Sequence, residues 1–108
     1  MNVLELAQQI AELTRENSKG AEALYTAEIE LAEAENELDL IEAKAFIKNQ
    51  GSVADRQALA RLESADARLR RDVAKAKVSR IKVKIKSLES NLMALATQAK
   101  LIQSEMKL

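Results

Sequence analysis

The sequence predicts an all-α protein, a long antiparallel helical hairpin of coiled-coil type that assembles as an oligomer. Composition is the first reason: 47% of the 108 residues are hydrophobic and 31% charged, but only 2% are aromatic, with no Pro and two Gly. This is typical of long helices, because few residues can end them. The second reason is a repeat of apolar residues every three or four positions on both sides of a single turn. We expect one domain over residues 1–108.

The first helix is expected at about residues 2–49. Its apolar or small side chains stay in phase from end to end: Val3, Leu6, Ile10, Leu13, Asn17, Gly20, Leu24, Ala27, Leu31, Ala34, Leu38, Ile41 and Ala45. Asn17 and Gly20 interrupt this seam chemically, and two interpretations stay open. The preserved phase favours one continuous helix, with or without a kink at 17–20, in which Asn17 sets the register. Alternatively, a short helix ends near residue 16 and a hinge follows.

The turn is expected at residues 49–52, within the stretch "NQGSVADR". Gly51 can adopt the left-handed conformation that ends a helix. Ser52 is a natural N-cap, and Asp55 follows at the third helical position, a weaker version of the capping box. Gly51, Ser52 and Asp55 therefore define the predicted turn.

The second helix is expected at about residues 53–107. The expected seam is Leu62, Ala65, Leu69, Val73, Lys77, Ile81, Ile85, Leu88, Leu92, Leu95, Ala99, Ile102 and Met106, with a run of four-residue steps between Leu69 and Ile85. The stretch "RIKVKIK" (80–86) alternates as a strand does. We nevertheless predict helix there, because Ile81, Ile85 and Leu88 lie in phase with the downstream seam and no Gly or Pro turns the chain.

Both helices carry a second apolar or small stripe outside the main seam. In the first helix it consists of Leu4, Ala11, Tyr25, Ala32 and Phe46, and in the second of Ala76, Val83, Ser87, Ser90 and Ala94. A hairpin of two helices has one seam, so these stripes would stay in water without further helices. We therefore predict a homo-oligomer in which Leu4, Tyr25, Phe46 and Val83 pack between subunits. Tyr25 and Phe46 are interpreted as packing residues, not base-stacking platforms.

The net charge of zero hides a strong asymmetry along the chain. Residues 1–50 hold eleven acids and four bases, and residues 51–108 hold six acids and thirteen bases. Folding about residues 51–52 places residue i near residue 103 − i, so the acidic stretch 28–42 should lie beside the basic stretch 61–75. Exposed pairs of this kind add little stability, but they determine orientation and partner choice.

Enzyme functions are disfavoured by the inventory of side chains. The chain has no Cys and no His, which removes thiol catalysis, histidine acid–base chemistry and zinc sites, and two isolated glycines cannot build a phosphate-binding loop. We expect no enzyme activity, cofactor, metal or small-molecule substrate. No apolar run approaches the ~18 residues of a membrane span, so a cytoplasmic protein is expected.

The basic stretch is the feature with the clearest functional meaning. Its cations are Lys77, Arg80, Lys82, Lys84 and Lys86, and residues 17–26, which should lie opposite residues 77–86, contain Glu22 as their only acid. Two interpretations stay open: the cations pair with acids of another subunit, or they contact phosphates of a nucleic acid. Because aromatic residues are so scarce, such binding would be independent of base sequence and sensitive to salt.

The stretch "AKAFIKNQGSVADRQALARLESADARLRRDVAKAK" and the ending "LIQSEMKL" resemble small coiled-coil proteins of tailed phages and prophages, over about residues 25–108. The general shape is also similar to phage recombination mediators of the UvsY kind. The resemblance implies a setting of DNA replication and recombination in the host cytoplasm. The expected partners are single-stranded DNA or a recombination or replication protein. The alternative is an adaptor coiled coil that binds only proteins, for example an inhibitor of a host factor.

Overall fold

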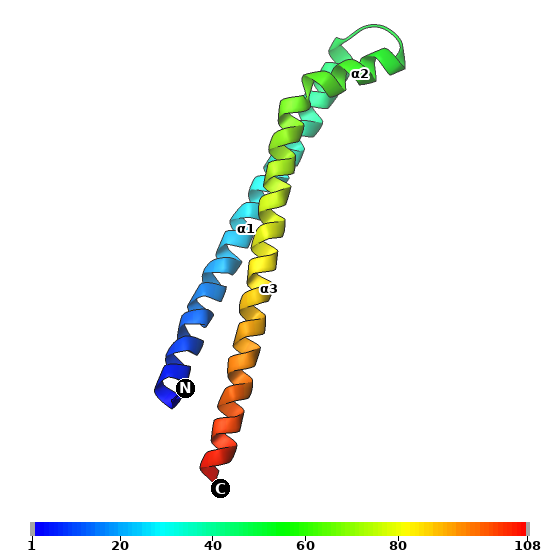
Figure 1. The fold of residues 1–108 in the computed structure, drawn as a ribbon. Coiled ribbons are helices and arrows are strands. Elements are labelled where there is room, and N and C mark those ends of the chain that lie inside the picture. Colours follow the sequence, from blue (N-terminus) through cyan, green and yellow to red (C-terminus); the bar gives the residue numbers. More distant parts are fainter. Residues whose placement is uncertain (1, 108) are drawn as a thin grey trace. The chain divides into compact units, whose positions relative to one another are not determined.

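The computed structural model describes residues 2–107, which form three α-helices: α1 (Val3–Lys48), α2 (Val53–Glu63) and α3 (Ala65–Lys107) (Figure 1). The prediction of an all-α protein is confirmed. The alternating stretch 80–86 lies inside α3 and is helical. Over the described residues, none of the helices combines the length and the apolar character needed to cross a membrane.

The chain divides into two compact units, which are described separately. The turn unit comprises residues Tyr25–Ser79, and the terminal unit comprises the residues up to Leu24 together with those from Arg80 onward. In the turn unit, the second half of α1 is antiparallel to the start of α3, and α2 crosses the end of α1 at an angle (Figure 1). In the terminal unit, the first half of α1 is antiparallel to the rest of α3 (Figure 1).

Helix α1 continues without interruption through Asn17 and Gly20. Apart from the exposed Val3, every residue of the seam predicted for this helix is buried or half-buried. Gly20 brings the two helices of the terminal unit close together, since a Cβ atom placed on it would lie 3.0 Å from Cγ1 of Ile85. Asn17 also lies on the seam, and its Oδ1 atom is buried without a hydrogen-bond partner.

Residues at both ends of the connection between α1 and α2 make contacts that stabilise it. Gly51 has a φ of +117°, a conformation that favours glycine, and a Cβ atom there would meet the carboxylate of Asp55. Ser52 is the N-cap of α2, and its Oγ accepts a hydrogen bond of 3.1 Å from the backbone N–H of Asp55. Arg56 donates from Nε to the carbonyl oxygen of Phe46, and its guanidinium lies 4.1 Å from the centre of the Phe46 ring.

Asn49 closes the other side of this turn. Its Nδ2 donates to the carbonyl oxygen of Ala45 at 2.7 Å and to Oε1 of Glu63 at 3.3 Å. The hydrogen bond from Asn49, followed by that from Lys48, lowers the pKa of the Glu63 carboxyl group below its usual value. The end of α1 is thereby connected to the end of α2 by polar contacts.

The helix predicted for residues 53–107 is interrupted at Ser64, which separates α2 from α3. Ser64 donates its backbone N–H to Ala60, but the backbone bond that would join Ala65 to Arg61 is missing among the described residues. The released carbonyl oxygen of Arg61 lies within reach of the Ser64 hydroxyl at 3.2 Å and of Arg68 Nη1 at 3.4 Å. Side chains thus replace a bond of the helical ladder, a recognised cause of a helix break.

The predicted seam is wrong between residues 62 and 77. Leu62, Leu69 and Val73 are 73%, 63% and 61% exposed. The residues that face α1 are instead Ala60, Ser64, Ala67, Arg71, Ala74 and Val78. These residues follow alternating steps of four and three and join in phase with Ile81, Ile85 and Leu88. The prediction favoured the largest apolar residues and so produced a run of four-residue steps, whereas the true seam uses mostly small residues.

Candidate nucleic-acid interface

Charged residues flank the seam of the turn unit on both sides. On one side Arg68 pairs with Glu42 (2.8 Å), and on the other Arg70 pairs with Glu37 (2.6 Å) and Lys77 with Glu30 (3.1 Å). In an antiparallel pair of helices, residues at equivalent flanking positions face each other, so these pairs match acids of α1 with bases of α3. The acidic and basic stretches that were predicted to lie side by side do so.

Two details of the charge prediction need correction. The register is shifted by a few residues, since Glu30 lies opposite Lys77 and not opposite residue 73. As a consequence, Lys77 is neutralised within the chain and lies in the turn unit. We therefore remove Lys77 from the group of candidate phosphate-binding residues, which leaves Arg80, Lys82, Lys84 and Lys86.

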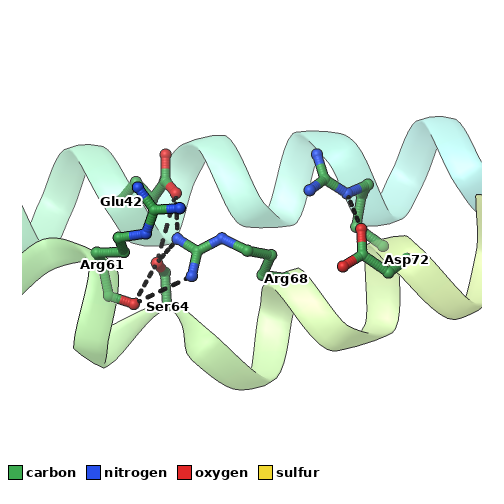
Figure 2. A network of polar contacts seen from close by, with 6 residues as sticks. Glu42, Arg61, Ser64, Arg68 and Asp72 are labelled. Carbon is green, nitrogen blue, oxygen red and sulfur yellow. Dashed lines mark hydrogen bonds and ion pairs between the residues drawn. The ribbon is translucent and has the colours of Figure 1, made fainter.

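Ser64, Glu42 and Arg68 form a partly buried polar network at the break between α2 and α3 (Figure 2). Arg68 Nη2 donates to Glu42 Oε1 at 2.8 Å and to Ser64 Oγ at 3.0 Å. The Ser64 side chain is fully buried, and its hydroxyl faces the Arg61 carbonyl oxygen and, at 3.5 Å, Glu42 Oε1. Every member of the network has a partner, so the network connects α1 to the break between α2 and α3.

The four remaining basic residues lie in the terminal unit and are all exposed. None of them makes an ion pair within residues 2–107. Because residues four apart share a face of a helix, the four side chains form two pairs. Lys82 and Lys86 flank the seam on one side, and Arg80 and Lys84 flank it on the other. The single group of cations predicted from the sequence is thus divided between two sides of the helix.

The edge that carries Arg80 and Lys84 also carries acids from α1. A groove of about 400 Å³ marks this edge and is lined by Glu16, Lys19, Gly20, Ala23, Ile81, Lys84, Ile85 and Leu88. Glu16 and Lys84 therefore lie on the same side of the unit, and Glu12 shares the face of Glu16 four residues away. We call this side the balanced edge, because acids and bases occur on it together.

The opposite edge is different, and we call it the lysine edge. Steps of seven residues from Glu42 toward the N-terminus lead to Ala21, Thr14 and Ala7, which therefore lie on this side of α1. Ser18 and Ala11 lie beside them. All five are uncharged. On α3 the charged residues of this edge are Lys82, Lys86, Glu89 and Lys100. Lys82 and Lys86 thus project from a surface on which α1 offers no carboxylate.

The residues predicted to pack between subunits lie on the surface of their units. Leu4, Tyr25 and Val83 are exposed, and Phe46 is half-buried beneath Arg56. They are not part of the seam, so they are available to a partner. Within residues 2–107, acidic side chains do not gather in a group of three or more that could hold a metal ion.

Comparison with known proteins adds no assignment: no protein-family model matches the chain, and neither a curated protein nor a solved structure matches it.

Proposed function

We propose that this chain is a non-enzymatic, oligomeric coiled-coil accessory protein that binds single-stranded DNA through its phosphates. The lysine edge of the terminal unit supports the proposal most directly. Lys82 and Lys86 are exposed, four residues apart, and without an ion-pair partner in the described chain. A pair of unneutralised cations, on an edge where α1 offers no carboxylate, attracts a polyanion and releases its counterions. The setting of phage DNA replication and recombination, which the resemblance implies, agrees with this proposal.

The binding mode follows from what surrounds the two lysines. Tyr25 and Phe46, which are the only Tyr and Phe of the sequence, both belong to the turn unit, so the terminal unit has no aromatic ring on which bases could stack. Contacts at the lysine edge would therefore go to phosphates, which carry no sequence information. We expect weak discrimination between base sequences and a strong dependence on salt.

Two double variants that remove the same number of charges test whether the lysine edge binds DNA. Lys82→Gln with Lys86→Gln removes the lysine edge, and Arg80→Gln with Lys84→Gln is the matched control on the balanced edge. The first variant should bind mixed-sequence single-stranded DNA more weakly, and its slope of log K against log salt should become shallower by about 0.7 for each phosphate that it no longer neutralises. The control should bind nearly as well as the parent. Fluorescence anisotropy over a salt series measures both quantities.

Two results would count against the proposal. A parent protein without affinity for DNA even at about 50 mM salt, where electrostatic binding is strong, would exclude nucleic-acid binding. If both double variants lost affinity equally, the protein would still bind DNA, but the lysine edge would contribute no more to binding than the balanced edge. A duplex of the same length, measured alongside, tests the preference for single strands.

The second candidate function is that of an adaptor coiled coil that binds only proteins, such as an inhibitor of a host factor. The observation in its favour is the outward apolar line of Leu62, Leu69 and Val73 on α2 and α3. Such a line fits the apolar face of another helix. This function predicts no DNA affinity in the parent and loss of partner binding when Leu69 is replaced by Gln.

A further inference from the structure

We propose that a second copy of this chain docks on the face of the turn unit that bears Phe46, in a face-to-face arrangement around a two-fold axis parallel to the helices. The product is a four-helix bundle in which α1 of each copy lies beside α2 and α3 of the other. This inference rests on the proposed self-association and assigns it a particular face and symmetry.

The docking face contains a shallow depression of about 750 Å³. The α1 side of the depression is lined by Asp39, Glu42, Ala43 and Phe46, and the opposite side by Ala54, Gln57, Ala58, Ala60, Arg61 and Arg68. Small alanines leave room around Phe46, and Arg56 covers one face of its ring. The depression can thus receive side chains from another helix, and its apolar part would be withdrawn from water.

On this face, the acidic side chains lie on α1 and the basic side chains lie on α2 and α3. Glu28 and Glu35 precede Glu42 at steps of seven, so they share its side of α1, and Asp39 lies on the rim of the depression. On the opposite side of the depression, Arg61 lies seven residues before Arg68 and Lys75 lies seven residues after it, so the three bases form a row. Within the described residues, only Glu42 and Arg68 of this set form an ion pair. Three acids on α1 and two bases on α2 and α3 are left without partners in this part of the chain.

A two-fold axis parallel to the helices brings these unpaired rows together. It places α1 of one copy beside α2 and α3 of the other at the same height, with α1 antiparallel to the partner's α3 as it is to α3 within one chain. The acidic row then faces the partner's basic row, and symmetry makes the contact twice. Asp39 of each copy would face Arg61 of the partner subunit. A nucleic acid fits this face poorly, because its acidic row would repel phosphates.

Charge reversal at Asp39 and Arg61 tests this arrangement. Asp39→Arg alone places two cations together in a homodimer, and Arg61→Asp alone places two anions together, so each should weaken self-association by roughly tenfold or more. An equimolar mixture of the two variants restores an attractive pairing, and it should form heterodimers in preference to either homodimer. Sedimentation over a concentration series measures the affinity, and native mass spectrometry identifies the heterodimer by its mass.

The matched control is Glu33→Arg, the same type of charge reversal on the side of α1 away from the depression, and it should leave the association unchanged. Helical content by circular dichroism verifies that each variant folds. A mixture that forms no heterodimers, or an equal effect of the control, would overturn this interface while leaving self-association intact. A parent that remains monomeric at every concentration would instead exclude self-association, and DNA binding by the lysine edge would still be tested separately.

Discussion

Ser64, Glu42 and Arg68 show how a few polar side chains determine the path of the backbone. Helix α2 ends where the Ser64 hydroxyl and the Arg68 guanidinium take over the carbonyl oxygen of Arg61. Arg68 is the central member, because it contacts Glu42, Ser64 and the Arg61 carbonyl together. Its side chain is only 25% exposed, whereas the Arg70–Glu37 pair on the other edge is about half exposed at both ends.

At the scale of single residues we predict that Arg68→Met destabilises the protein by about 1–2 kcal/mol, because the buried Ser64 hydroxyl oxygen and the Glu42 carboxylate lose the guanidinium that donates to both of them. Arg70→Met, the control, should cost at most about 0.5 kcal/mol because its ion pair is exposed. Urea denaturation followed by circular dichroism measures both. In a double-mutant cycle with Glu42→Gln we expect a coupling of about 0.5–1 kcal/mol. Equal costs for the two arginines would show that the network has no special role.

In α2 and α3, the largest apolar residues are not the ones that pack against α1. The large apolar residues Leu62, Leu69 and Val73 point outward, and the alanines at 60, 67 and 74 point toward α1. Facing them, α1 contributes large residues such as Leu31 and Leu38. Small residues on one helix accommodate large ones on the other, so the seam is filled without Leu on both sides.

The same substitution at two leucines distinguishes the observed seam from the predicted one. Leu69→Gln should change the free energy of unfolding by less than about 0.5 kcal/mol, because Leu69 is exposed. Leu38→Gln should cost about 2–5 kcal/mol, because Leu38 is buried in the seam. Thermal or urea unfolding at low protein concentration, where self-association contributes least, provides the comparison. If Leu69→Gln were as harmful as Leu38→Gln, the seam expected from the large apolar residues would be correct.

Over the whole molecule, equal numbers of acids and bases are distributed unequally between the two units. The turn unit holds eleven acids and nine bases, many of them paired, and the terminal unit holds six acids and eight bases. The surplus positive charge therefore belongs to the terminal unit, where we place the phosphate contacts. The complementary rows of unpaired acids and bases belong to the turn unit, where we place the contact between copies.

If the protein self-associates as proposed, its thermal stability should depend on protein concentration. If two copies bind in the folded state, mass action raises the melting temperature as the concentration increases. Raising the concentration of the parent from the low micromolar range a hundredfold should therefore raise its Tm measurably. The charge-reversed variant Asp39→Arg should show a much smaller rise. A Tm of the parent that is constant over this range would contradict association in the folded state.

The sequence by itself determined the helical character of this protein and the position of its turn. Ala-rich, Pro-free composition and heptad spacing predict helices in place of the apparent strand at 80–86, and the position of Gly51 before Ser52 predicts the turn that the structure contains. These features are local, because each depends on neighbours within a few residues along the chain. The seam of α1 was also predictable, since its phase is preserved through Asn17 and Gly20.

Only the tertiary structure decided how the two helical stretches face each other. The seam at Ala60–Val78 is composed mainly of alanine, so its hydrophobic signal is weaker than that of the exposed Leu62, Leu69 and Val73. At the break, Arg68 and Ser64 contact Glu42 from a distant part of the chain. The shifted register neutralises Lys77 and leaves Lys82 and Lys86 unpaired within the described residues. Pairing between residues far apart in sequence selects among several helical faces of similar hydrophobicity, and the local pattern cannot rank them.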